Sequence, residues 1–241
     1  MDNGHFDGPV AARYDADQGR DPALVARMVS VLAGLAGGGA ALEFAIGTGA
    51  VALPLAEAGV RVQGVELSRA MLDRLRAKPG GDAIPVALGD MTDTRVEGRF
   101  ALVYLVYNTI NNLTTQAAQV ACFRNAAAHL APGGRFVVEV GVPPLQRLPR
   151  GETRLAFERS DTHWGIDEFD VVAQAFTSHH VWMRDGARLT SSVSFRYVWP
   201  SELDLMAQLA GLTLEHRWAD WDRSPFTATS EAHVSVWRNP A

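Results

Sequence analysis

The segment from Ala41 to Ala52 constrains the fold of this chain more than any other part of the sequence. It is an apolar run that ends in Gly47 and Gly49 and then continues into helix-forming residues. Glycine permits a tight turn and lets a bound molecule approach the backbone without a Cβ atom in the way. A strand, a glycine turn and a helix in this order predict a ligand site at the carboxyl end of a strand in an α/β sheet.

Strand-like and helix-like segments alternate along most of the chain, which predicts a mostly parallel sheet with helices on both faces. Apolar runs predict strands at residues 41–46, 60–65, 84–88, 100–106, 135–140, 212–218 and 232–237. Capping residues and helix-ending glycines predict helices at residues 22–36, 50–58, 69–77, 115–130 and 201–210. In the helix that begins at Thr115, we expect a buried face of Val120, Phe123, Ala127 and Leu130.

Residues 145–199 break this alternation and read as an insertion. Strand-like segments lie at residues 153–158, 169–176, 179–184 and 189–197, and Asp185-Gly186 is a strong hairpin turn signal. We therefore expect a Rossmann-like core made of residues 1–144 and 200–241, with an antiparallel β flap at residues 145–199. We refer to residues 145–199 as the flap.

Composition excludes several classes of protein. The formal net charge is -5 and no cluster of Lys and Arg is present, so we expect no nucleic-acid partner. No run of about 18 apolar residues occurs, so we expect no membrane span. The acidic residues near the amino end argue against a secretory signal, and the single cysteine, Cys122, fits a reducing cytoplasm, where we expect the protein to be located.

The glycine turn alone fits two classes of nucleotide-binding protein about equally well. Glu66 closes the second predicted strand, 19 positions after Gly47, where a carboxylate can accept both hydroxyls of a ribose. However, Gly47-x-Gly49-x-x-Ala52 also matches the dinucleotide-binding pattern. An NAD-dependent oxidoreductase is therefore a serious alternative at this point.

Three further features favour a ligand other than NAD. Glu43 lies inside the first predicted strand, where a buried carboxylate needs a partner such as an ammonium group or backbone amides. Gly89-Asp90-Met91 ends the third predicted strand, where a carboxylate and an apolar side chain suit an adenine ring. The segment Leu130-Ala131-Pro132-Gly133-Gly134 leads into the fifth strand.

Taken in order, these segments resemble the class I S-adenosylmethionine-dependent methyltransferases, over roughly residues 41–141. The resemblance implies a seven-stranded sheet in the order 3-2-1-4-5-7-6 with the last pairing antiparallel. It also implies that Gly47 and Gly49 face the methionine part of the cofactor. The one departure is a missing third glycine, which we place at Val51.

The same resemblance assigns the other cofactor residues. Glu66 contacts the ribose, Asp90 and Met91 contact the adenine, and Leu67 is a further cofactor-binding residue. Glu43 suits the methionine ammonium, although loop amides alone would also satisfy it. Tyr14 resembles a tyrosine that closes over the cofactor, and the sequence equally fits a tyrosine that packs the first helix.

The predicted function is transfer of a methyl group from S-adenosylmethionine to N or O of a small-molecule acceptor, in bacterial secondary metabolism. A catalytically inactive S-adenosylmethionine-binding protein is a third alternative. Tyr107 and Asn108 follow the fourth strand and are the expected acceptor-positioning residues, and His179 is the candidate base. No acidic or Cys/His cluster predicts a metal. The sequence leaves a homodimer open.

Overall fold

The computed structural model describes Phe6, residues 8–184 and residues 186–240. A seven-stranded sheet forms the core, with its strands in the order β3-β2-β1-β4-β5-β11-β10. These strands are β1 (Ala41–Phe44), β2 (Val62–Glu66), β3 (Val86–Leu88), β4 (Phe100–Leu105), β5 (Leu130–Gly141), β10 (Thr213–Trp218) and β11 (Ala232–Arg238). Counted within this sheet alone, the order is the expected one. The labels differ because the strands of the flap come between β5 and β10.

The pairing of the last two strands in this order, β11 and β10, is antiparallel, as expected. Strand β11 also runs antiparallel to its other neighbour, β5. The strands β1 to β5 pair in parallel with one another. Their carboxyl ends therefore lie at the same edge of the sheet, where ligands bind in such folds.

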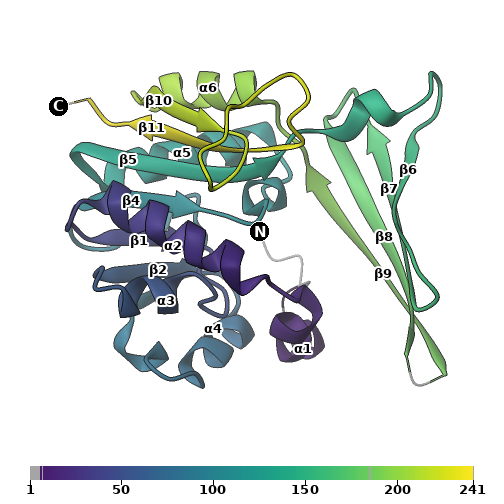
Figure 1. Ribbon diagram of the computed structural model, residues 1–241, viewed down its shortest axis with the longest axis horizontal. Helices are drawn as coiled ribbons and strands as arrows, with labels where there is room; N and C mark the ends of the chain where they lie inside the picture. Colours follow the sequence, from purple (N-terminus) through teal and green to yellow (C-terminus); the bar gives the residue numbers. More distant parts are fainter. Residues whose placement is uncertain (1–5, 7, 185, 241) are drawn as a thin grey trace.

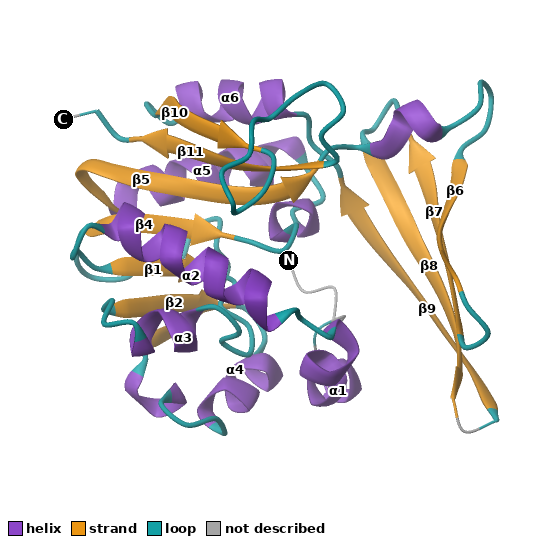
Figure 2. Cartoon of the chain, in the orientation of Figure 1, coloured by secondary structure: helices purple, strands orange, loops and turns teal. Residues whose placement is uncertain are grey.

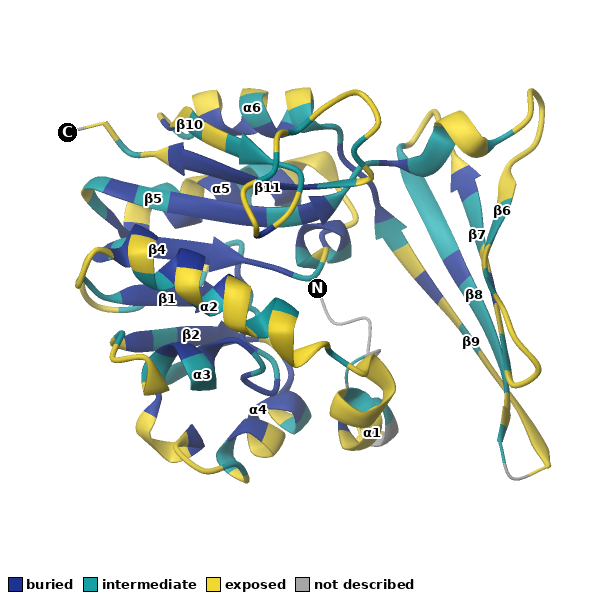
Figure 3. Ribbon diagram, viewed as in Figure 1, coloured by how far each residue is buried: buried dark blue, intermediate teal, exposed yellow. Residues whose placement is uncertain are grey.

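Helices cover both faces of the sheet (Figures 1 and 2). They are α1 (Gly8–Gln18), α2 (Pro22–Ala36), α3 (Ala52–Glu57), α4 (Arg69–Arg76), α5 (Gln116–His129) and α6 (Pro200–Leu209), with short 3-10 turns η1 (Gly81–Ala83), η2 (Thr109–Asn112) and η3 (Pro144–Arg147). Side chains of α5 and α6 pack on one face, and those of α2, α3 and α4 pack on the other. Because both faces are covered, the central strands are buried along their length (Figure 3).

Local sequence sets the helix ends. Asp21 accepts a hydrogen bond from the amide of Ala23, Ser68 from that of Met71, and Thr115 from that of Ala118. The predicted face of α5 is partly wrong. Val120 and Ala127 are only half-buried, whereas the polar residues Gln119, Asn125 and His129 are buried and hydrogen-bonded. Apolar periodicity does not identify buried polar residues, so the sequence pattern missed these three.

The flap carries a separate antiparallel sheet, β6 (Arg154–Arg159), β7 (His163–Asp170), β8 (Ala175–Arg184) and β9 (Ala187–Arg196), in sequential order. The strand predicted at residues 169–176 is wrong, because the chain turns there. The Asp170 carboxylate accepts hydrogen bonds from the amides of Val172 and Ala173, and Val172 is 94% exposed. In the predicted Asp185-Gly186 turn, Asp185 lies outside the described residues, and Arg184 pairs with Ala187.

Among the described residues, no helix is long and apolar enough to cross a membrane.

Candidate active site

The glycine turn after β1 is built from three residues with left-handed backbone conformation. Ala45, Gly47 and Gly49 have φ values of 51°, 57° and 79°. Ala45 is thus the position that adopts this conformation without being glycine, at an energetic cost. Val51 has a φ of -106°, so the missing glycine was misplaced there in the sequence analysis.

Glu66 at the end of β2 is tied to this turn. One carboxylate oxygen accepts a hydrogen bond of 2.7 Å from the Gly47 amide, and the other accepts one of 2.8 Å from the Ser68 amide. Burial raises the pKa of Glu66, and these amide donors counteract part of the increase. Each oxygen keeps a second lone pair, so the carboxylate can hold the turn and a ligand at once.

A pocket extends from Glu66 toward the end of β3. We call it the Glu66 pocket, and its lining includes Glu66, Leu67, Met71, Asp90, Met91 and Leu113. One Asp90 oxygen accepts hydrogen bonds from the amide and the hydroxyl of Thr92, at 2.8 and 2.7 Å. Burial opposes ionisation of Asp90, but these bonds outweigh it and lower its pKa. The predicted ribose and adenine residues therefore line one pocket.

Glu43 lies on the other side of the glycine turn and is almost fully buried. The register of β1 and β4 places it opposite Tyr104, whose hydroxyl donates a 2.9 Å hydrogen bond to it. Burial raises the pKa of Glu43 to about 8, although the Tyr104 bond and the charge of Arg20 act in the opposite direction. The partner expected for a buried Glu43 carboxylate is thus in part Tyr104, on the neighbouring strand.

A second, smaller pocket, which we call the Arg20 pocket, lies between Arg20, Glu43, Gly47, Tyr14 and Tyr107. The Arg20 guanidinium lies 5.1 Å from the centre of the Tyr14 ring and 4.7 Å from that of Tyr107. Sequence reasoning missed Arg20, because it lies in the short link between α1 and α2 and belongs to none of the recognised motifs.

Helix α1 is fastened to the glycine turn by a set of contacts that we call the α1 clasp. Asp15 accepts a 2.6 Å hydrogen bond from the Thr48 hydroxyl and pairs with Lys78 at 2.7 Å. The Lys78 ammonium also donates to the Thr48 carbonyl at 2.7 Å. The clasp holds Tyr14, which precedes Asp15, beside both pockets. Lys78 is the only lysine in the chain. This was the one feature of the sequence that pointed to a special role for Lys78.

The residues that follow β4 have an uncommon backbone. Tyr107 and Asn108 have φ values of 56° and 58°, a conformation that costs free energy in residues other than glycine. The Tyr107 amide donates a 2.6 Å hydrogen bond to the Glu139 carboxylate, and the Asn108 side chain accepts one of 2.6 Å from Gly141. Strand β5 therefore fixes the two predicted acceptor-positioning residues.

A third and much larger cavity, of about 900 Å³, lies between α1, the loops after β4 and β5, and the flap. We call it the flap cavity. Tyr107 and Asn108 line it, as do Phe176, Ser178, His180 and Trp182 of β8. Tyr14 and Thr109 line all three pockets, so the three spaces meet at these two side chains.

The expected position of His179 is wrong. Alternate residues of β8 line the flap cavity, and His179 belongs to the opposite set. Its ring bonds to Ser192 at 2.8 Å and lies 3.5 Å from Glu168 on the outer face of the flap. The neighbouring His180 faces the cavity instead. Adjacent residues of a strand face opposite sides, so the sequence alone does not tell which of the two histidines faces inward.

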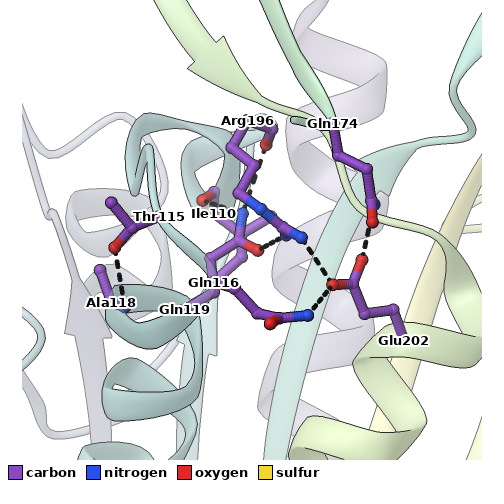
Figure 4. Close-up of polar contacts among 8 residues, drawn as sticks. All are labelled: Ile110, Thr115, Gln116, Ala118, Gln119, Gln174, Arg196 and Glu202. Atoms are coloured by element: carbon purple, nitrogen blue, oxygen red, sulfur yellow. Dashed lines mark hydrogen bonds and ion pairs between the residues drawn. The ribbon is translucent and has the colours of Figure 1, made fainter. Parts of the chain in front are cut away.

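The base of the flap is joined to the core by a buried polar network (Figure 4). Arg196, at the end of β9, donates to the Gln119 side chain and pairs with Glu202 at 2.7 Å. Gln119 in turn donates to the carbonyl of Ile110 in η2 at 3.2 Å. The same network therefore fixes both the flap and η2, the turn that contains Thr109.

Two other types of chemistry lack support among the described residues. No group of three or more His, Cys, Asp or Glu side chains in that part of the chain is arranged as metal ligands are. Cys122 is fully buried in α5, and burial raises the pKa of its thiol, so it is unsuited to act as a nucleophile.

Comparison with known proteins agrees with this geometry. Residues 41–134 match a family model described as a methyltransferase domain. The solved structure of the CcbJ methyltransferase from Streptomyces caelestis is 39% identical, with a TM-score of 0.85 and coverage of 96% of each chain. The cypemycin N-terminal methyltransferase of a Streptomyces species is 29% identical over 229 residues, which are 88% of this chain and 92% of that protein.

A shorter match is to the dTDP-3-amino-3,6-dideoxy-alpha-D-glucopyranose N,N-dimethyltransferase of Streptomyces fradiae. It is 38% identical over 98 residues, which are 41% of this chain and 38% of that protein. These similarities favour a methyltransferase over both alternatives, the NAD-dependent oxidoreductase and the inactive binding protein. The chain belongs to the family of S-adenosylmethionine-dependent methyltransferases.

Proposed function

We propose that this enzyme methylates the nitrogen of a small-molecule amine that binds in the flap cavity. The observation that carries the proposal is the meeting of the three pockets at Tyr14 and Thr109. A cofactor that filled the Glu66 and Arg20 pockets would span this junction, and we propose that its sulfur would lie there. An acceptor in the flap cavity then approaches the same point from the other side.

The residues of the two cofactor pockets fit S-adenosylmethionine. We assign the ribose hydroxyls to Glu66 and the adenine to Asp90 and Met91. Arg20 is suited to the methionine carboxylate, and its Nε atom is buried without a hydrogen-bond partner among the described residues. Glu43 is suited to the methionine ammonium, because a nearby cation favours its ionised form.

The cofactor supplies a methyl group bound to a cationic sulfur. After the methyl group is transferred, the sulfur is left as a neutral thioether. The protein residues need only bind and align the acceptor, because charge is not built up in the displacement. Tyr107 and Asn108 are proposed to do this. The Tyr107 hydroxyl is buried and makes no hydrogen bond to any residue that the structure describes, and a ligand in one of the two pockets that Tyr107 lines would supply the missing partner.

The side chains that follow β4 favour nitrogen over oxygen as the attacking atom. Those that line the flap cavity there are Tyr107, Asn108, Thr109, Asn111 and Asn112. All are hydroxyls or amides and are neutral at pH 7, so none of these five is an efficient base for a hydroxyl acceptor. The histidines and carboxylates that line the same cavity lie on α1 and the flap instead. An amine that arrives unprotonated needs no base. One relative is named as an N,N-dimethyltransferase of an amino sugar, and another as an N-terminal methyltransferase.

We also propose that residues 145–199 act as a cover for the acceptor, because one face of β7, β8 and β9 lines the flap cavity. Such covers exclude water and complete a site when they close.

Matched amine and alcohol acceptors test the proposal. The enzyme and S-adenosylmethionine are incubated with alaninamide or lactamide, and with 3-amino-3,6-dideoxyglucose or 6-deoxyglucose. S-adenosylhomocysteine is quantified and the methylated atom is located by mass spectrometry. We expect methylation of the amines at nitrogen, a lower kcat for Tyr107→Phe, and unchanged turnover for His179→Gln. Equal methylation of the alcohols would contradict the assignment of nitrogen.

A further inference from the structure

The flap cavity is long in one direction. Its wall on β8 runs from Phe176 to Arg184, and both residues line it. These are eight residues apart, so at about 3.3 Å per residue the wall is about 26 Å long. Phe176 lies at the core end of β8. It pairs with Phe195 of β9, which directly precedes Arg196 at the base of the flap. A single sugar ring or amino acid occupies only a small part of this length.

The wall changes in character along β8. At the core end it is aromatic, with Phe176 stacked against Phe169 at 5.5 Å and against Phe195 at 5.0 Å. Farther along β8 from the core, polar residues line the wall. The Ser178 hydroxyl donates to the Asp167 carboxylate on the neighbouring strand. The next cavity-facing residue of β8 is His180, about 13 Å from Phe176 at the same rise per residue.

His180 belongs to a cluster of three rings, which we call the distal cluster, formed with His163 and Trp182. The three ring planes lie within 13° of one another, with centres 4.8 to 5.2 Å apart. His163 Nε2 and His180 Nδ1 are 2.9 Å apart. One nitrogen donates this hydrogen bond and the other accepts it, so at least one of the two rings is uncharged. The distal cluster therefore presents three nearly parallel rings to the flap cavity.

Helix α1 borders the far end of the cavity, opposite β8. Arg184 of the flap pairs with Asp17 of α1 at 3.0 Å, and Arg13 lies 3.7 Å from the same carboxylate. The Arg184 guanidinium also lies 5.8 Å from the centre of the Trp182 ring. The distal cluster therefore faces a cavity that α1 borders on its opposite side.

We propose that His163, His180 and Trp182 form a second acceptor subsite that binds a planar ring remote from the methylated amine. The acceptor is then an elongated amine of at least two covalently linked units. The separation of about 13 Å between Phe176 and His180 equals about four residues of extended peptide, and this length sets the length of the probes. This inference rests on the proposed function, because the amine is placed at Tyr107 and Asn108.

Peptide amides of defined length test the subsite. The probes are alaninamide, tetra-alanine amide, and the same tetrapeptide amide with tryptophan at its last position. Each is titrated by calorimetry into enzyme saturated with S-adenosylhomocysteine. We expect the tryptophan probe to bind about tenfold tighter than tetra-alanine amide, the size of effect that one aromatic contact and one hydrogen bond supply.

Neighbouring residues of β8 provide matched variants. His180→Ala and Trp182→Ala should each abolish most of the tryptophan advantage, and Trp182→Phe should retain most of it. His179→Ala, on the outer face of the same strand, should leave the advantage intact. Alaninamide should bind equally to all four variants. Equal binding of the two tetrapeptides, or an equal loss in His179→Ala, would overturn the subsite.

These readouts separate the subsite from the proposed function. Calorimetry with the demethylated cofactor involves no methyl transfer, so the tryptophan advantage is measured whether or not a probe is methylated. Absence of N-methylated product from every amine contradicts the proposed function, whereas absence of a ring preference in binding contradicts the subsite alone.

Discussion

At the scale of single residues, the two buried carboxylates of the site behave differently from one another. Glu66 accepts hydrogen bonds from the backbone amides of Gly47 and Ser68, whereas Glu43 accepts one from the Tyr104 hydroxyl and has a pKa raised to about 8 by burial. The sequence assigned ligand roles to both. It did not reveal that each carboxylate also accepts hydrogen bonds within the protein, because the donors come from other strands and loops.

Glu43 should make the ligand-free enzyme less stable as pH rises. Its folded pKa of about 8 exceeds the ordinary value of 4.5, so its contribution is fully present below about pH 4.5 and is lost as pH rises toward 8. Glu43→Gln cannot ionise, and should therefore gain about 1–3 kcal/mol over wild type between pH 5 and pH 8. Urea unfolding at several pH values measures this. Parallel stability profiles for the two proteins would show that Glu43 ionises normally.

Glu66→Ala should lower both cofactor affinity and stability. Loss of charge-assisted bonds to the ribose should weaken S-adenosylhomocysteine binding at least tenfold. The amides of Gly47 and Ser68 also lose their acceptor, so the free energy of unfolding should fall by about 1–3 kcal/mol without any ligand. Calorimetry and urea unfolding measure the two effects, with Glu57→Ala on the exposed side of α3 as control. A stability loss with unchanged affinity would exclude the ribose role.

At the scale of elements, the site depends on how α1 and the flap are attached to the core. The α1 clasp joins α1 to the glycine turn, and the Arg196 network joins the flap to α5, α6 and η2. Both attachments use side chains far apart in sequence. Helix α1 itself was absent from the sequence prediction, since its polar residues give little apolar periodicity.

Lys78→Met should loosen α1 and weaken cofactor binding. The substitution removes both Lys78 contacts of the α1 clasp, while Tyr14 and the rest of α1 stay unchanged. We expect faster amide hydrogen exchange in residues 8–18 and a several-fold higher KM for S-adenosylmethionine, with kcat nearly unchanged. Arg74→Met, an exposed substitution on α4, is the control. Exchange in α1 that matches wild type would mean that the clasp does not hold the helix.

At the scale of the whole molecule, the cofactor side was far more predictable than the acceptor side. Gly47, Glu66 and Asp90 each lie at the end of a strand, and parallel strands bring their carboxyl ends together, so short local motifs determine that half of the site. The flap cavity combines α1, η2 and one face of β8. Its inward residues depend on the phase of the strand, and sequence alone could not distinguish His179 from His180.

The central claim concerns where the reacting groups meet, and a crystal structure with S-adenosylhomocysteine and a bound amine tests it most directly. The account predicts the ribose at Glu66, the sulfur beside Tyr14 and Thr109, and the amine nitrogen facing that sulfur from the flap cavity, near Tyr107 and Asn108. An amine bound outside the flap cavity, or a sulfur remote from Tyr14 and Thr109, would contradict it.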